Sequence, residues 1–404
     1  MACAGAALAA VGAFLAFQGK YLFRSEPVLQ QAEDTLEKRS LQSRTAHNSA
    51  FCRANLENDA QTDAYDAVAE YAFYDESEGF SVYGADKNDL NKAVNAFLND
   101  HPEVFWIDSS SGYRYAEYDD SIYAELNFTE SGSQLQSDRE TLAAAVEAAA
   151  AGAPDNASDY EAECYLNDYL AERCAYNSDG ENKHSSFGAL VDGQAVCDGY
   201  SHAFQLLCQR LDIPCTVVEG NSDFNEDTED GHMWNCVRLG ENWYHVDVTW
   251  NDSLNAANGA EHYFYLNLTT AEIERDHEIS GDYDHRFQNR GNFFNVFVPD
   301  CGSDEYNYMK RSFVTIKNPD DDEQILASLL SAARGQKSWC AYVIDDSADF
   351  DKISGEVINR YAADWIQGAN HFTGGKPKIA DSTKVVTYQN KRVIAFALEY
   401  ENKQ

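Results

Sequence analysis

The chain has 404 residues, of which 44% are hydrophobic and 13% aromatic, so it can bury the cores of two or three domains. With 68 Asp and Glu against 30 Lys and Arg, its net charge of −38 repels the phosphates of nucleic acids and anionic lipid surfaces. We therefore expect no nucleic-acid partner, whereas a basic substrate would be attracted. The ten cysteines include no CxxC pair, so neither a thiolate zinc site nor a thioredoxin motif is indicated, and we expect no metal and no cofactor.

The amino terminus begins with an unbroken run of small and apolar residues at 2–17, followed by Lys20 and Arg24. The run is short for a membrane span and resembles a signal-peptide core, although no basic residue precedes it. We expect 1–24 to be a signal-like or anchor segment and the protein to be exported, at the cell surface or outside. An apolar helix packed on the body is the alternative. Mixed charges and few apolar repeats predict a polar tether at 25–61.

Residues 62–132 are expected to form a small N-terminal α/β domain. The spacing of apolar residues at 90–98 predicts a helix that ends near Asp100. Apolar and β-branched runs at 104–107 and 122–128 predict two strands.

The central region, 133–299, holds the densest block of chemistry. Residues 134–151 are Ala-rich and predict a helix, and capping-box spacing at Ser158 predicts the start of another. Apolar residues at helical spacing from 200 to 211 predict a third helix that starts at or just after Cys197. The unpaired N–H groups and the positive dipole at a helix start stabilise an anion, so this position favours a thiolate.

Two strands, 232–239 and 243–250, are predicted to form an antiparallel hairpin joined by a short turn. A turn of two or four residues places His232 opposite Thr249, and Asp247 then lies on the same face within side-chain reach of His232. A three-residue turn would place them on opposite faces. The preferred register therefore predicts a His–Asp pair.

The tail, 300–404, alternates strands and helices and is expected to be a separate α/β domain without a recognisable site. The predicted elements are strands at 313–316 and 339–344, helices at 321–334 and 350–366, and a closing hairpin of 384–389 and 392–400 that turns at Asn390 and Lys391.

Cys197, His232 and Asp247 supply the three roles of thiol catalysis. Cys197 would attack a carbonyl carbon. His232 would take the thiol proton and return it to a leaving amine, while Asp247 would hold the imidazole tautomer and stabilise the imidazolium.

The stretches around these residues resemble the transglutaminase-like superfamily in its bacterial, papain-related form. They are AVCDGY at 195–200, HMWN at 232–235 and WYHVDVTWND at 243–252. They stand in the family's order, and the resemblance covers about 158–290. It implies an α+β fold with a papain-like transglutaminase core, in which the nucleophile helix packs on an antiparallel sheet, flanked here by two smaller α/β domains. It also assigns the three residues above as the triad, and it extends to Asp276 and His277 as downstream structural positions.

Further site residues are expected around the triad. Papain-like sites add a side-chain donor to the backbone N–H of the nucleophile, and Gln194 is the candidate for this oxyanion hole. Trp234 and Trp250 are candidates for flanking the substrate cleft. His245 is the rival base, but it follows the turn too closely to match the family position.

Simpler explanations exist for each feature. Cys197 could be a buried structural thiol, and a Cys/His/Asp metal site would have only three ligands. The acidic stretch 223–230 lacks the Gly and Glu that an EF-hand requires at its sixth and twelfth positions. It is expected to be a solvated loop that could favour basic substrates.

The sequence thus predicts thiol-dependent acyl transfer on peptide or protein amides. Hydrolysis is favoured over transamidation, because the exported bacterial members that the chain resembles look more like proteases than cross-linkers. The alternative is a catalytically silent transglutaminase-like module for binding or surface assembly.

Overall fold

The computed structural model describes residues 50–74, 79–107, 113–222, 231–253, 263–280, 295–320, 322–374 and 376–401, all of which belong to one compact unit. The signal-like segment expected at 1–24, most of the tether expected at 25–61 and the acidic loop at 223–230 lie outside these ranges. Within them, no helix is both long and apolar enough to cross a bilayer.

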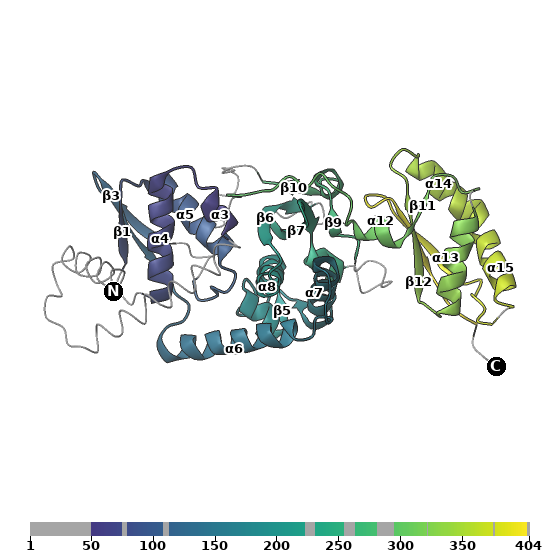
Figure 1. Ribbon diagram of the computed structural model, residues 1–404, viewed down its shortest axis with the longest axis horizontal. Helices are drawn as coiled ribbons and strands as arrows, with labels where there is room; N and C mark the ends of the chain where they lie inside the picture. The colour runs from purple at the N-terminus through teal and green to yellow at the C-terminus, as the bar shows by residue number, and fades with distance from the viewer. Residues whose placement is uncertain are drawn as a thin grey trace, which may run out of the picture. The chain divides into compact units, whose positions relative to one another are not determined.

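The N-terminal part of the described chain combines helices with a three-stranded antiparallel sheet of order β1-β3-β2 (Figure 1). Its elements are α3 (Phe51–Ala54), α4 (Asp59–Tyr74), β1 (Phe80–Tyr83), α5 (Lys87–Asp100), β2 (Tyr113–Glu117) and β3 (Ser121–Leu126). A capping box between Asp86 and Asp89 starts α5, and the helix ends at Asp100, as predicted.

The strand predicted at 104–107 is wrong. Only Ile107 forms a bridge, to Phe128, and the side chains of all four residues are buried. Successive residues of a strand point to opposite faces, so four consecutive buried side chains fit an irregular segment wrapped into the core.

The central helices are α6 (Gly132–Ala150), α7 (Asp159–Arg173) and α8 (Cys197–Arg210). Ser158 caps α7 in the predicted capping box with Glu161. Between α7 and α8 lie a π-helical turn (Gly188–Asp192) and the short parallel strands β4 (Ala175–Tyr176) and β5 (Gln194–Ala195). One buried cluster contains Val68 and Phe97 of the N-terminal helices together with Phe204 of α8. The N-terminal elements and α8 therefore share a core.

A five-stranded antiparallel sheet of order β10-β6-β7-β8-β9 carries the other predicted site residues. Its strands are β6 (Cys215–Ser222), β7 (His232–Leu239), β8 (Asn242–Val246), β9 (Leu266–Leu268) and β10 (His277–Ile279). Asn235 pairs with Val246, which is the predicted register, and the turn is Gly240-Glu241, with Gly240 at φ +61°. Gly tolerates this left-handed conformation without steric cost.

The second strand of this hairpin ends earlier than predicted. After Val246 the chain turns into α9 (Val248–Ser253), so Asp247 lies between strand and helix, not opposite Trp234 in a ladder. The cause is local capping: the carboxylate of Asp247 accepts the N–H of Trp250 at 3.0 Å, and its carbonyl oxygen accepts the N–H of Asn251.

The two faces of the sheet pack differently. On one face Val237 and Leu239 of β7 join Phe204 and Leu207 of α8, whereas Trp234, on the other, lies in a second cluster. Helix α8 thus packs on the antiparallel sheet, which agrees with the α+β prediction.

The C-terminal part is a four-stranded mixed sheet of order β11-β12-β14-β13, with helices beside it (Figure 1). Its elements are α12 (Tyr308–Ser312), β11 (Val314–Ile316), α13 (Asp322–Arg334), β12 (Trp339–Ile344), α14 (Phe350–Glu356), a π-helical turn (Val357–Tyr361), α15 (Ala362–Phe372), β13 (Lys384–Tyr388) and β14 (Val393–Ala397). The predicted hairpin around Asn390 and Lys391 is confirmed.

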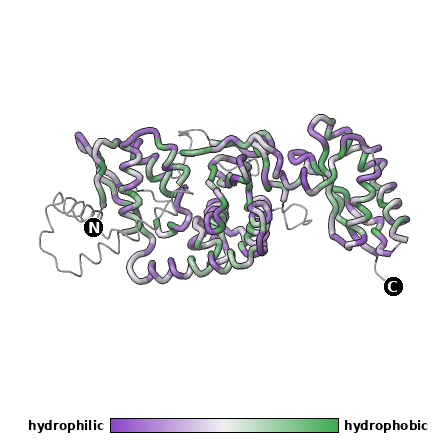
Figure 2. The backbone as a smooth tube through the Cα atoms, in the orientation of Figure 1, coloured by the Kyte–Doolittle hydropathy of each residue, from purple (hydrophilic) through white to green (hydrophobic). Residues whose placement is uncertain are grey.

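Each face of this sheet has its own partner. Tyr342 and Ile344 of β12 pack against the helices, whereas Ala341 and Val343 join the cluster that contains Trp234. The strands are correspondingly hydrophobic in Figure 2. The C-terminal sheet therefore packs on the face of the central sheet that carries Trp234, and the two flanking domains expected from the sequence stay a prediction.

Candidate active site

Cys197 is the first residue of α8. Val196 precedes it in an extended conformation, with φ −105° and ψ −174°, and offers no side-chain cap to the helix. The first-turn N–H groups of α8 therefore lack a cap from this residue, and a helix start of this kind favours an anion. Gly199 allows the preceding loop to lie close, because a Cβ there would overlap the carbonyl oxygen of Lys183. The side chain of Cys197 is half-buried, so it can meet a substrate.

His232 is the first residue of β7 and contacts both other triad candidates. Its Nε2 lies 2.7 Å from Oδ2 of Asp247, which has no exposed surface. The thiol of Cys197 lies near enough to the ring to help raise the pKa of His232. Because Nε2 is engaged by Asp247, Nδ1 is the nitrogen left for the thiol. The structure thus brings the three predicted residues together.

The protonation of this pair follows from burial and charge. Burial alone would lower the pKa of His232, but the charge and hydrogen bond of Asp247, with a contribution from Cys197, raise it to about 9. Burial alone would raise the pKa of Asp247, but His232 and then His277 hold it well below its usual range. At neutral pH, His232 is therefore an imidazolium beside a carboxylate.

A second histidine supports the same carboxylate. Nε2 of His277 lies 3.0 Å from Oδ2 of Asp247, and Nδ1 of His277 lies 2.8 Å from Oδ1 of Asp276. Burial alone would lower the pKa of His277, but its hydrogen bonds to the two carboxylates raise it. His277 therefore bridges Asp247 and Asp276.

Lys391 is the last group in a row of buried side chains whose charges alternate in sign and that begins with His232. Its Nζ lies 3.1 Å from Oδ2 of Asp276 and 3.5 Å from the centre of the Tyr265 ring, and the side chain is almost fully buried. Burial lowers the pKa of Lys391 to about 8, although Asp276 opposes the shift. The turn of the β13–β14 hairpin thus provides a cation for a site built mainly on the central sheet.

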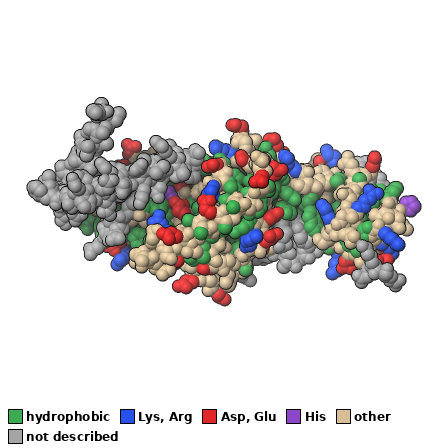
Figure 3. Space-filling model, turned by 60° about the horizontal axis from the view of Figure 1, so that its bottom comes forward, with side chains coloured by type: hydrophobic (Ala, Val, Ile, Leu, Met, Phe, Trp, Pro, Cys, Tyr) green, Lys and Arg blue, Asp and Glu red, His purple; other side chains and the backbone are tan. Residues whose placement is uncertain are grey.

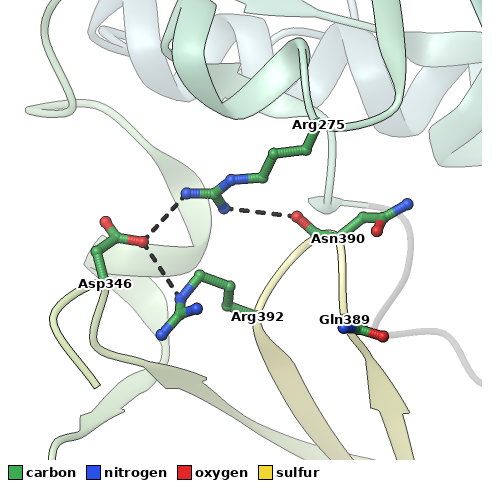
Figure 4. Close-up of a pocket in the computed structure, with 5 residues that line it drawn as sticks. All are labelled: Arg275, Asp346, Gln389, Asn390 and Arg392. Atoms are coloured by element: carbon green, nitrogen blue, oxygen red, sulfur yellow. Dashed lines mark hydrogen bonds and ion pairs between the residues drawn. The ribbon is translucent and has the colours of Figure 1, made fainter. Parts of the chain in front are cut away.

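A second set of charged side chains contacts the turn of the β13–β14 hairpin, as Figure 4 shows. Arg275 contacts Oδ1 of Asp346 at 3.1 Å and the carbonyl oxygen of Asn390 at 3.5 Å, and Arg392 also reaches Asp346 at 3.4 Å. With Gln389 these residues line a cavity of about 420 Å³. None of them belongs to the triad, so this cavity marks the docked hairpin and not the reaction centre.

Lys391 was not predicted to be a site residue, and His277 was predicted only as a structural position. The dipeptide Asp276-His277 was a usable signal, because a buried acid beside a histidine fits a relay of charges. Lys391 carried no such signal, since a lysine in a hairpin turn is usually solvated.

The predicted cleft residues have different outcomes. Trp234 has no exposed surface, stacks on His232 at 5.9 Å between ring centres and donates from Nε1 to Nδ1 of His245 at 3.0 Å. The prediction that it flanks the cleft is therefore wrong: it braces His232 from within the core. Trp250 is 8% exposed and lies 6.0 Å from the His232 ring, so its cleft role stays a prediction.

Gln194 lies three residues before Cys197 in β5 and is exposed. Its side-chain oxygen accepts a hydrogen bond from Asn177 at 2.5 Å, which fixes the orientation of the amide group. Its role in an oxyanion hole stays a prediction.

His245 shares the sheet face of His232 but belongs to a different set of contacts. Trp234 lies between them, and His245 instead contacts Cys236, directly opposite it in the ladder, and Thr270. The rival base is thus separated from His232 by the indole.

Comparison with known proteins finds a family resemblance in the segment that carries these residues. Residues 146–248 match the family model of the transglutaminase-like superfamily. This segment is transglutaminase-like. It spans α7, α8 and strands β6 to β8, and it contains Cys197, His232 and Asp247. His277 and Lys391 lie beyond the C-terminal end of the transglutaminase-like segment.

Known proteins resemble the chain only over part of their length. Kyphoscoliosis peptidase from Mus musculus and that from Homo sapiens are each 37% identical to it over 65 residues, which is 14% of this chain and a tenth of each relative. A solved structure of a candidate cysteine protease from Cytophaga hutchinsonii is 16% identical, covering 35% of this chain and 62% of that one, with a TM-score of 0.23. A solved TGase is 13% identical, covering 48% and 58%, with a TM-score of 0.25.

Proposed function

We propose that this protein transfers acyl groups from peptide or protein amides through a thioester on Cys197, with water as the usual acceptor. The observation that carries the proposal is the 2.7 Å contact between Nε2 of His232 and Oδ2 of Asp247, which leaves Nδ1 as the nitrogen available to the Cys197 thiol at the start of α8. Membership of one segment in a superfamily that includes cysteine proteases and acyltransferases supports the same reaction class.

Each side chain has one task in the proposed reaction. The Cys197 thiolate attacks the amide carbon, and the imidazolium of His232 gives its Nδ1 proton to the leaving amine as the C–N bond breaks. A water molecule then gives a proton back to His232 and attacks the thioester, which releases the acid and restores the thiolate–imidazolium pair. Asp247 keeps the ring oriented and charged throughout.

The acceptor is tested by offering both nucleophiles in one assay. An unstructured protein substrate is incubated with the enzyme and a fluorescent primary amine, and new termini and protein-bound fluorescence are measured together. Hydrolysis predicts new termini without fluorescent product, and transamidation predicts the reverse. Cys197→Ala is the negative control, and its melting temperature must equal that of the wild type.

A binding module without turnover remains the second candidate. It predicts that wild type and Cys197→Ala give equal, background signals in this assay and bind a partner equally well. The intact His232–Asp247 pair and the charges behind it favour turnover, because binding alone requires no buried row of ionised groups.

The substrate is proposed to be basic. Acidic side chains are spread over the visible face in Figure 3, with Lys and Arg between them, and the sequence carries 38 excess negative charges. Long-range attraction of this kind is screened by salt. Lys-rich peptides should therefore react faster than Glu-rich peptides of equal length at low ionic strength, and the difference should shrink in 0.5 M salt (roughly three times physiological ionic strength).

A further inference from the structure

A second cysteine-containing cluster lies on the same sheet face as the triad, behind Trp234. Sγ of Cys236 in β7 is 3.7 Å from Sγ of Cys301, and it is 3.2 Å from Nδ1 of His245. These three side chains have at most 1% exposure. The proposed acyl transfer uses none of them.

We propose that Cys236 and Cys301 are joined by a disulfide bond when the protein folds in an oxidising environment. The two sulfurs are already in van der Waals contact, although 65 positions separate them in the sequence. Closing the bond requires an approach of about 1.7 Å, which small rotations of two side chains can supply.

The surroundings favour exchange between these two sulfurs. The hydrogen bond with Cys236 lowers the pKa of Cys301, although burial opposes the shift, whereas burial raises the pKa of Cys236. Of the two thiols, Cys301 therefore loses its proton more easily. A thiol that ionises readily beside a second thiol is what thiol–disulfide exchange requires.

A metal site fits these residues less well. The nitrogen of His245 that faces Cys236 is Nδ1, and it already accepts the indole N–H of Trp234 at 3.0 Å. That N–H would point at a bound cation. The other nitrogen, Nε2, faces the hydroxyl of Thr270 at 3.2 Å. The pair of sulfurs is thus better suited to bond to each other than to share a metal.

The exchange balances with a small disulfide such as oxidised glutathione as the oxidant, before burial is complete. The Cys301 thiolate attacks one glutathione sulfur, the glutathione S–S bond breaks, and one glutathione thiolate leaves. Cys236 then loses its proton to solvent and its thiolate attacks the Cys301 sulfur, the mixed S–S bond between Cys301 and glutathione breaks, and the second glutathione thiolate leaves and takes up a proton. Two protein thiols are oxidised, and one glutathione disulfide is reduced to two thiols.

The bond would connect two parts that the proposed site requires. Cys236 follows Trp234, which braces His232, by two residues on β7. Cys301 is held by the N–H of Thr270 on its carbonyl oxygen, and its segment leads into α12 and the sheet whose hairpin bears Lys391. The cross-link would thus fasten the C-terminal sheet to the strand that carries the proposed base.

The test uses the full chain, refolded in a mixture of oxidised and reduced glutathione. Free thiols are blocked with N-ethylmaleimide in denaturant, and digested peptides are examined by mass spectrometry with and without reduction. The proposal predicts a linked pair of peptides containing Cys236 and Cys301, lighter than the two free peptides by two hydrogens. Reduction of the native protein should lower its melting temperature by about 5 °C.

Variants separate the bond from simple packing. Cys301→Ser should show no change in melting temperature on reduction, whereas Cys340→Ser should keep the wild-type response, because Cys340 contacts the hydroxyls of Ser328 and Tyr342. Recovery of both Cys236 and Cys301 as blocked thiols from the refolded wild type would overturn the proposal, as would stoichiometric zinc bound to the two thiols. The wild-type peptide map decides the question even if a variant does not fold.

Discussion

Replacing Asp247 by Asn tests how the proposed site controls the charge of its base. The carboxylate accepts hydrogen bonds from His232 and His277 on Oδ2 and from the N–H of Trp250 on Oδ1. Asn has nearly the same shape, but it carries no charge and only one of its two terminal atoms can accept. The substitution therefore removes the charge while largely preserving the packing.

The size of the effect follows from the pKa of His232. Its rise from an ordinary 6.5 to about 9 corresponds to roughly 3 kcal/mol in favour of the imidazolium, at about 1.4 kcal/mol per tenfold change. Without the charge of Asp247, burial dominates and the pKa falls below 6.5. At pH 7 the ring is then mostly neutral and its tautomer is not fixed, so acyl transfer should fall by about 10²- to 10⁴-fold.

The assay follows His232 directly. Protein labelled with ¹⁵N-histidine is titrated by NMR, with His232→Gln used to assign the resonance. The wild type should titrate near pH 9 and Asp247→Asn below 6.5. Asp276→Asn is the matched control, because it removes a buried carboxylate on the far side of His277 and leaves the His232–Asp247 contact intact. A His232 pKa that stays near 9 in Asp247→Asn, or falls equally in both variants, would refute the reasoning.

Three further predictions concern the same face. His232, with a pKa of about 9, must be protonated to release the amine. We therefore expect kcat/KM to stay constant up to about pH 8 and to fall as the pH rises through 9. A pH profile without this fall would contradict the assignment of His232 as the acid. Lys391→Met breaks a buried ion pair with Asp276 and should lower the free energy of unfolding in urea by about 3 kcal/mol. The control, Lys384→Met, changes an exposed side chain on an edge strand and should alter this free energy by less than about 0.5 kcal/mol. Equal effects of the two substitutions would contradict a structural role for Lys391. Gly220→Ala places a methyl group against the backbone of β10 and should cost more than about 2 kcal/mol in the same unfolding experiment; a neutral result would mean that β10 does not lie where the structure places it.

The triad geometry could be predicted because it depends on local rules. The apolar spacing after Cys197 identified the helix start, and the short turn at Gly240 set the register that puts His232 and Asp247 on one face. The extent of β8 could not be predicted in the same way. Alternating residues up to Trp250 fit a strand, and only the capping by Asp247 ends it.

Contacts between residues that are far apart in the chain could not be predicted from the sequence. Lys391 is 115 positions from Asp276, and nothing in a hairpin turn indicates which face of another sheet it will meet. Trp234 was misplaced for a related reason: period-2 alternation shows that a side chain shares a face with His232, but not whether a second sheet covers that face.

The most direct test of the central claim needs no substrate. Alkylation of Cys197 by iodoacetamide is followed against pH, peptide by peptide, in wild type and His232→Ala. A thiolate–imidazolium pair predicts fast labelling of Cys197 at pH 6, well below the value near 8.5 at which a free thiol ionises, and loss of that fast labelling in the variant. Slow labelling that follows an ordinary thiol and is unchanged in His232→Ala would contradict the thiolate–imidazolium pair and with it the enzyme.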